Sequence, residues 1–357
     1  YYCQAAMLNQ VGIATVAKAK HLLILVASAG LKLAKFGGNA SRPALLMQFN
    51  PANKFACLLA RLHLRFVWHC QMLWRYAIGR RDQYLMPDQL SVVYESDNFI
   101  VINKEFDLSV NTASRWFNPL ALNTQVFLAK HHRADPTAYH WYRFCHQIDH
   151  ATSGLILLAY SQDAAMRASK AFLNRRVLKQ YLAIVWGHFD TRDHVTVDRP
   201  IGWDRLDIAG SGDLRKHMVT ETHYRCLDPK PAFSQVVPLE RGLYNGLPAT
   251  KVLLLLKHGR THQLRVHTSC IGHPIVGDVK YSRREADFRC HRMMLHAYRL
   301  QARLPRLSET IDCLAEDPFV PESDANWQPE SVQNDYAVFK DCARILESGE
   351  QLTVDKL

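Results

Sequence analysis

Two features are missing from this sequence, and each absence excludes a class of protein. The nine cysteines form no Cys-x-x-Cys pair and are odd in number, which argues against a zinc module and favours free thiols in a reducing compartment. No segment has the character of a membrane span. The longest uncharged apolar run, Leu22–Leu31, is too short to cross a bilayer. Phe55–Trp74 is long enough, but Arg61 and Arg65 would each cost roughly 2.5–3.5 kcal/mol at mid-membrane.

Acidic residues are absent from the first 81 positions, which contain eleven Lys or Arg. This composition fits a mitochondrial presequence, a basic membrane-surface or RNA-binding helix, or sequence that is not part of the native protein. We favour the last interpretation, which predicts a cytoplasmic or nuclear protein. A mitochondrial location follows if residues 1–81 are a native presequence. Residues 1–88 are therefore treated as an N-terminal extension.

The remaining charge is divided between a basic middle and an acidic end. The 357 residues are 48% apolar and carry a net charge of +11, with a net of +9 over residues 82–307 and −9 over residues 308–357. The composition can support a sizeable core, and a basic central region favours an anionic partner, nucleic acid first. We expect a central domain at residues 89–305 and an acidic C-terminal tail at residues 306–357.

Hydrophobic patterning predicts a domain that mixes strands with helices. A hairpin is expected from Val92–Tyr94 and Phe99–Ile102, and a helix capped by Ser161 should extend to about Arg175. Residues 188–218 read as a loop-rich insertion, followed by strand-like pieces at Thr220–Leu227 and Val236–Leu239. Further strands are predicted at Gln180–Trp186 and Val252–Leu256, and a second helix should begin at Thr261 and end before Gly272.

Asp149 stands out because it precedes the most apolar strand of the chain. The run Gly154–Ala159 reads as a strand buried on both faces, so Asp149 should lie on a loop at the edge of the core. Partial shielding from water makes the charge state of such a carboxylate sensitive to its neighbours. An ordinary turn or helix cap explains Asp before Thr-Ser-Gly as well.

Arg265 requires an acidic partner that its own helix does not contain. Leu264, Thr268 and Ile271 should face the core, which places Arg265 at the edge of the core. An unpaired buried guanidinium is prohibitively costly, and Asp149 is the candidate partner. Otherwise Arg265 is a solvated residue on the outer helix face.

The histidines allow a different hypothesis about function. His258, His262 and His267 would then bind the metal of a His-dependent hydrolase.

Several blocks together resemble one enzyme family. His146-Gln147-Ile148-Asp149 followed by Thr152-Ser153-Gly154-Leu155 resembles the signature of the RluA-type pseudouridine synthases, in which His-Arg-Leu-Asp precedes Thr-Ser-Gly-Leu. The segments GRTHQLRVH (259–267) and GHPIVGD (272–278), the Lys179-x-Tyr181 strand and Met294–Ala297 follow in family order, so the resemblance covers residues 90–303. One eukaryotic member is more similar still, through Glu240–Tyr244 and Asp317–Phe319.

The resemblance implies a fold, a reaction and a set of roles. The fold would be α+β, with a mixed, mostly antiparallel sheet, flanking helices and a central cleft. The reaction would convert uridine to pseudouridine in a tRNA, rRNA or mRNA, without metal or cofactor. We expect the protein to be a monomer. Asp149 would be the nucleophile and Arg265 its salt-bridge partner. Tyr181 would stack on the flipped uracil, Leu264 would form part of the pocket wall, and Gln147 would contact the substrate.

Two positions depart from the family pattern. Most members have Arg where this chain has Gln147, and that Arg is thought to fill the gap left by the flipped base. His258 stands where Thr usually precedes the Gly-Arg turn. Gln147 lacks the charge of Arg, which leaves open an alternative: an RNA-binding pseudoenzyme that keeps the cleft but has lost turnover.

Overall fold

The computed structural model describes residues 90–111, 121–135, 137–205, 217–282 and 284–334. The N-terminal extension expected at residues 1–88 and the end of the acidic tail, from residue 335, lie outside the described residues. None of the described helices combines the length and apolar character needed to cross a bilayer. The five described cysteines, Cys145, Cys226, Cys270, Cys290 and Cys313, are free thiols.

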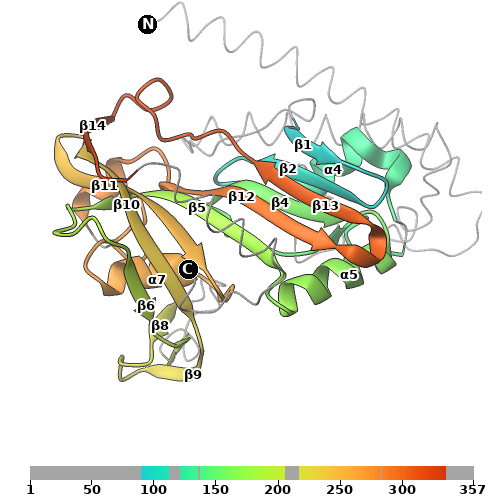
Figure 1. Ribbon diagram of the computed structural model, residues 1–357, viewed down its shortest axis with the longest axis horizontal. Coiled ribbons are helices and arrows are strands. Elements are labelled where there is room, and N and C mark those ends of the chain that lie inside the picture. Colours follow the sequence, from blue (N-terminus) through green and yellow to red (C-terminus); the bar gives the residue numbers. More distant parts are fainter. Residues whose placement is uncertain (1–89, 112–120, 136, 206–216, 283, 335–357) are drawn as a thin grey trace, which may run out of the picture. The chain divides into compact units, whose positions relative to one another are not determined.

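One large sheet organises the described residues (Figure 1). Its strands follow the order β1 (Val92–Glu95), β2 (Phe99–Lys104), β4 (Ser153–Ala159), β12 (Leu295–Leu304), β5 (Val177–Trp186), β11 (Leu247–Leu256), β10 (Phe233–Tyr244) and β14 (Trp327–Val332). Three more strands pair with these: β3 (Arg143–Phe144) with β4, β6 (Val195–Asp198) with β10, and β13 (Glu309–Leu314) with β12. Only β4 and β12 pair in parallel within the described ranges. The predicted mixed, mostly antiparallel sheet is confirmed.

Helices and a smaller sheet complete the fold. The α-helices are α4 (Leu122–Lys130), α5 (Gln162–Leu173) and α7 (Gln263–Cys270), and the short 3-10 helices are η1 (His131–Arg133), η2 (Glu285–Arg289) and η3 (Pro305–Leu307). α5 packs against β3, β4 and β12, whereas α7 packs against β8 and β10. The smaller sheet has the order β8 (Met218–Thr220), β7 (Ile201–Asp204) and β9 (Cys226–Lys230).

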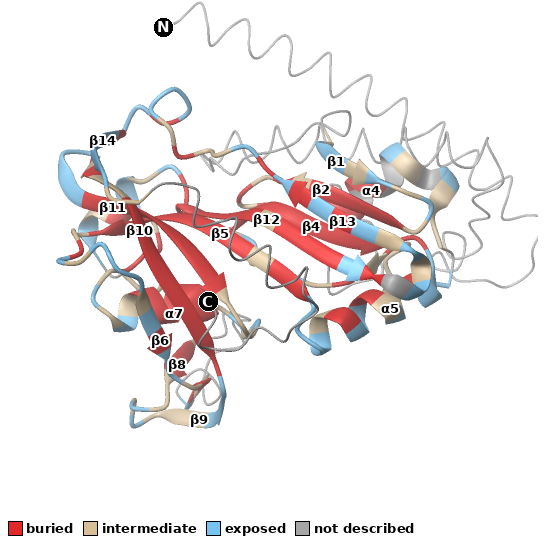
Figure 2. Ribbon diagram, viewed as in Figure 1, coloured by how far each residue is buried: buried red, intermediate tan, exposed pale blue. Residues whose placement is uncertain are grey.

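The apolar runs of the sequence form the middle of the large sheet. Every residue of β4 is buried, as expected for a strand covered on both faces, and β5, β10, β11 and β12 are buried over most of their length (Figure 2). α5 begins where predicted, because the Ser161 side chain accepts a hydrogen bond from Ala164 N.

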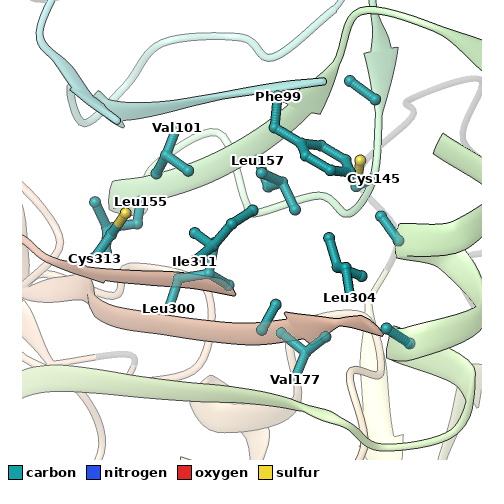
Figure 3. Packing of buried hydrophobic residues seen from close by; sticks show 14 of the residues in the cluster. Phe99, Val101, Cys145, Leu155, Leu157, Val177, Leu300, Leu304, Ile311 and Cys313 are labelled. Atoms are coloured by element: carbon teal, nitrogen blue, oxygen red, sulfur yellow. The ribbon is translucent and has the colours of Figure 1, made fainter. Parts of the chain in front are cut away.

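α5 covers the sheet with small side chains. Ala164, Ala168 and Ala171 belong to one buried hydrophobic cluster, which also contains Phe99 of β2, Leu157 of β4, Leu300 of β12 and Ile311 of β13 (Figure 3). Three alanines at helical spacing let the helix approach the sheet closely. This contact fixes the end of α5 relative to the strands that carry the site.

Three expectations about the elements were wrong. The insertion expected to be loop-rich contains strands β6 and β7, and the strand-like piece at Thr220–Leu227 divides into the end of β8, a turn and the start of β9. Thr261 does not cap α7: the cap residue is His262, which has a φ of 55° and no capping side-chain hydrogen bond. β13 and β14, which both lie beyond residue 305, pair with β12 and β10 of the large sheet.

Gly154 is required where the parallel pair of strands begins. It has a φ of 106°, and a Cβ built at this position would lie 2.3 Å from the carbonyl oxygen of Ala297. We therefore expect Gly154→Ala to destabilise the protein by about 2–4 kcal/mol, through a disfavoured φ and a backbone clash. Urea unfolding measures this loss. Gly246→Ala is the control, because Gly246 also has a positive φ but no heavy atom within 4 Å of an added Cβ. An equal loss in both variants would contradict the close approach as the cause.

Candidate active site

A large open pocket lies at one end of strands β5 and β11. Its volume is about 1040 Å³. Its walls come from the loop between β3 and β4, the end of α5, the start of β5, and the segment that leads from β11 into α7. All five residues that the sequence assigned to the site, Gln147, Asp149, Tyr181, Leu264 and Arg265, line this pocket.

Asp149 lies on the loop that leads into β4, as predicted. Its main-chain carbonyl accepts a hydrogen bond from Thr152 N at 3.1 Å, which closes a turn before the strand. The side chain is 25% exposed. The carboxylate is therefore accessible from the pocket while most of its surface is shielded.

Arg265 connects Asp149 to a second carboxylate. Its Nη1 donates to Asp149 Oδ2 at 3.1 Å, and its Nε and Nη2 donate to the two oxygens of Asp278, each at 2.8 Å. Arg265 is 8% exposed and Asp278 only 1%. Burial alone would lower the pKa of Arg265, but the hydrogen bonds to Asp278 and the charges of Asp278 and Asp149 outweigh burial and raise it. The guanidinium therefore stays charged.

The sequence did not predict Asp278 as a partner, although Asp278 ends one of the blocks that carry the resemblance. The bidentate contact fixes the plane of the guanidinium, which leaves Nη1 directed at Asp149. Arg265 is also more buried than expected, because every residue of Gln263–Thr268 is buried. A buried guanidinium has five N–H donors and therefore needs more than one acceptor. The number of donors could have indicated a second acid from the sequence.

Tyr181 and Lys179 extend from β5 into the pocket, as their spacing of two residues predicted. Tyr181 is 9% exposed, and burial together with the charge of Asp149 raises its pKa, so its phenol is neutral. Burial lowers the pKa of Lys179 to about 8. Leu264, 6% exposed, supplies apolar wall. The pocket thus offers an apolar and aromatic lining around one carboxylate.

Comparisons with known proteins identify the family. The pattern of the family described as RNA pseudouridylate synthase matches residues 98–270. RNA pseudouridylate synthase domain-containing protein 1 of Danio rerio is 44% identical over 246 residues, which cover 68% of this chain and 79% of that protein. The chain belongs to the RluA-type RNA pseudouridine synthases.

Two further relatives agree with this assignment of the chain to the family. Dual-specificity RNA pseudouridine synthase RluA of Haemophilus influenzae is 30% identical over 240 residues, covering 64% of this chain and 94% of that protein. The solved structure of human RNA pseudouridylate synthase domain containing 1 superposes with a TM-score of 0.63 at 35% identity, covering 76% of this chain and all of that one. The resemblance read from the sequence blocks is confirmed at the level of family and fold.

Gln147, the main departure of this chain from the family pattern, is exposed and lines the pocket two residues before Asp149. An exposed amide on this loop can reach into the pocket and form hydrogen bonds without contributing charge. The position is therefore available for contact with a nucleic acid strand.

Lys104 of β2 holds the Asp149 loop through hydrogen bonds to backbone carbonyls. The sequence did not predict this role. It is 1% exposed, and its Nζ donates to the carbonyls of Glu105, Leu108 and His150 at 2.7, 2.9 and 3.0 Å. Burial lowers its pKa to about 7. Because His150 directly follows Asp149, the contact from β2 fixes the loop that carries the carboxylate.

His262 is a second residue near Asp149 that the sequence assigned a different role. Its Nε2 lies 4.0 Å from Asp149 Oδ2, and its Nδ1 lies 2.7 Å from the hydroxyl of Tyr281. Burial lowers its pKa to about 4, so the ring is neutral. In the tautomer whose Nδ1 accepts from Tyr281, the Nε2–H faces Asp149.

The three histidines of the alternative metal site have separate partners. His258 contacts Arg175, His262 contacts Tyr281, and His267 bonds Ser234 and the Arg199 carbonyl. His267 is fully buried in α7. The described residues contain no group of three or more His, Cys, Asp or Glu side chains placed to hold a metal ion. These histidines therefore do not converge on one point.

His146 should make the folded state less stable at low pH. Its Nε2 accepts a hydrogen bond from Leu157 N at 3.0 Å, and burial, assisted by the charge of Lys179, lowers its pKa from 6.5 to about 3. Between these values the unfolded chain binds more protons than the folded one, so stability falls as pH is lowered through this window. At about pH 5 the loss should approach 2 kcal/mol for this ring.

Urea unfolding at neutral pH and at about pH 5 measures this effect. His146→Gln is the matched variant, because its amide oxygen can accept from Leu157 N but does not titrate. Its stability should change less between the two conditions than that of the wild type. Equal losses in the two proteins would show that His146 is not a source of the acid sensitivity.

Proposed function

We propose that this protein isomerises uridine to pseudouridine in RNA, with Asp149 as the nucleophile and Arg265 as its salt-bridge partner. The observation that carries the proposal is the accessible Asp149 carboxylate in a large pocket, 3.1 Å from a guanidinium that Asp278 holds in place. The fixed guanidinium holds the Asp149 carboxylate in place and aims it at the substrate.

The reaction rearranges one nucleoside without net change in composition. The bond between N1 and C1′ breaks, a bond between C5 and C1′ forms, C5 loses its hydrogen as a proton, and N1 gains a proton. Asp149 assists cleavage by attack on C1′ or on the pyrimidine ring, or by removal of the C2′ proton. No redox change occurs in any of these routes, so the side chains of the pocket suffice.

The remaining pocket residues bind the flipped nucleoside. Removal of a base from its stack costs a few kcal/mol, which contacts in the pocket must offset. Tyr181 supplies an aromatic face for stacking on the uracil, and Leu264 supplies the apolar wall. Gln147 enters the space that the base leaves. The substrate is a tRNA, an rRNA or an mRNA.

Chemical mapping of RNA tests the proposed function. Carbodiimide treatment marks pseudouridine, so total RNA from cells without the gene should lack marks that are present in the parent cells. Expression of the wild-type protein should restore these marks, and expression of the Asp149→Asn variant should not. If the parent cells and the cells with restored wild-type protein carry no mark that the cells without the gene lack, the proposal fails.

A further inference from the structure

Arg175 has a backbone conformation that its side-chain type does not favour. It follows the end of α5 with a φ of 56°, and its N–H and that of Arg176 bond back to Phe172 O and Ala171 O at 3.1 and 2.9 Å. Glycine is the usual residue at such a left-handed position after a helix, because a Cβ strains it. A long charged side chain kept at a strained position points to a use for that side chain.

His258 holds the Arg175 guanidinium at the pocket. The two residues come from the same end of two neighbouring strands, since Gln180 of β5 pairs with Leu255 of β11. Arg175 Nη2 lies 3.2 Å from His258 Nε2. Burial lowers the pKa of His258 to about 4, so a neutral imidazole accepts this hydrogen bond. Both residues line the pocket, and Arg175 itself is exposed.

The charge around the pocket favours an anion at this position. Of the described residues that line the pocket, Asp149 is the only acid, and it already contacts Arg265. The lining cations are Arg175, Lys179, Lys257, Arg260 and Arg265. No carboxylate among the described residues forms an ion pair with Arg175. By contrast, the half-buried Arg167 of the preceding helix α5 pairs with Asp163 at 2.7 Å. An exposed guanidinium with free N–H groups is well suited to bind a phosphate.

We propose that Arg175 binds a backbone phosphate of the RNA next to the target uridine, and that His258 positions its guanidinium for this contact. The proposal rests on the proposed function and adds a substrate-binding residue to it. The phosphate contact anchors the strand at the pocket mouth while the base enters. Arg175 therefore acts on RNA affinity and on KM, whereas kcat depends on Asp149 and Arg265.

RNA binding as a function of salt concentration tests the phosphate contact. The probe is a fluorescently labelled RNA stem-loop with one uridine in its loop, titrated with the full chain over a series of KCl concentrations. For Arg175→Gln we expect Kd to rise roughly five- to tenfold, and the slope of log K against log salt to fall in magnitude by about one. Isomerisation of the same RNA should show a raised KM and an unchanged kcat.

Two control variants separate a specific contact from general charge. Arg176→Gln removes the same charge from the adjacent exposed residue, which does not line the pocket, and it should change the slope less. Arg175→Gly should raise the melting temperature, because glycine relieves the strained φ, and should lower RNA affinity as Arg175→Gln does. Loss of affinity without loss of stability excludes a folding defect as the cause.

A double-mutant cycle tests the role of His258. His258→Phe keeps the ring volume but removes the acceptor, and should weaken RNA binding by about two- to threefold in the wild type and not at all in Arg175→Gln. Equal effects in both backgrounds would overturn the positioning role. An unchanged Kd and salt slope in Arg175→Gln would overturn the phosphate contact, even if the wild type forms pseudouridine. If the wild type binds RNA through Arg175 but never isomerises it, the proposed function fails and this inference stands.

Discussion

Asp149→Asn is expected to abolish pseudouridine formation, with kcat lowered by at least about a thousandfold. The amide has nearly the same shape and can still accept a hydrogen bond from Arg265 Nη1, so the pocket should keep its geometry. It lacks the charge and the nucleophilicity of the carboxylate. RNA binding should stay within a factor of about two, because Asp149 contributes no positive charge to phosphate binding.

Single-turnover conversion of the RNA stem-loop measures the fall in rate, with the pseudouridine formed quantified by nucleoside chromatography. Asp163→Asn is the matched control: Asp163 is an exposed acid of α5 that pairs with Arg167, and its loss should leave the rate unchanged. If Asp149→Asn retains the wild-type rate, Asp149 is not the nucleophile. A wild-type protein that binds RNA without turnover would instead favour the pseudoenzyme alternative.

The second large effect is expected at Arg265. Arg265→Met should destabilise the protein by roughly 3–5 kcal/mol and eliminate activity, because Asp278, 1% exposed, would keep a buried charge without its partner. Arg265→Lys should fold, but with activity reduced by one to two orders of magnitude, because one ammonium cannot reproduce the contacts to both carboxylates.

A double variant separates the structural from the catalytic contribution of Arg265. Arg265→Met combined with Asp278→Asn removes both buried charges, so urea unfolding should show at least half of the lost stability restored. Activity should not return, because Asp149 would still lack its cation. Recovery of activity together with stability would mean that Arg265 acts only through folding.

The local pattern of the sequence predicted the elements that carry the site. The strand after Asp149 is apolar on both faces, and it forms the fully buried β4. The spacing of Lys179 and Tyr181 placed both side chains in one pocket. The demand of a helix-borne Arg for an acid predicted the contact between Arg265 and Asp149, which lie 116 positions apart. These predictions succeeded because burial and charge pairing strongly constrain the residue types involved.

Contacts set by tertiary packing were not predictable in the same way. Lys104 reads as the polar end of a strand, and only the folded chain brings the His150 carbonyl to its ammonium. The turn residue Thr261 looked like a helix cap, but α7 begins at Gln263. Its cap residue is His262, which has a left-handed backbone and contacts Tyr281. β6 pairs with β10, and β7 pairs with β8 and β9. Because β6 and β7 are short and are stabilised by these partners, their own sequences show little strand periodicity.

Release of hydrogen from C5 of uridine tests the central claim most directly. Formation of the C5–C1′ bond expels the C5 hydrogen, so RNA labelled with tritium at C5 of uridine must release tritium to water as pseudouridine forms. With total RNA from cells without the gene, the wild-type protein should release tritium in a one-to-one ratio to the pseudouridine formed, and Asp149→Asn should release none. No release by the wild type, or equal release by the variant, would contradict the assignment of this pocket as a uridine isomerase with Asp149 at its centre.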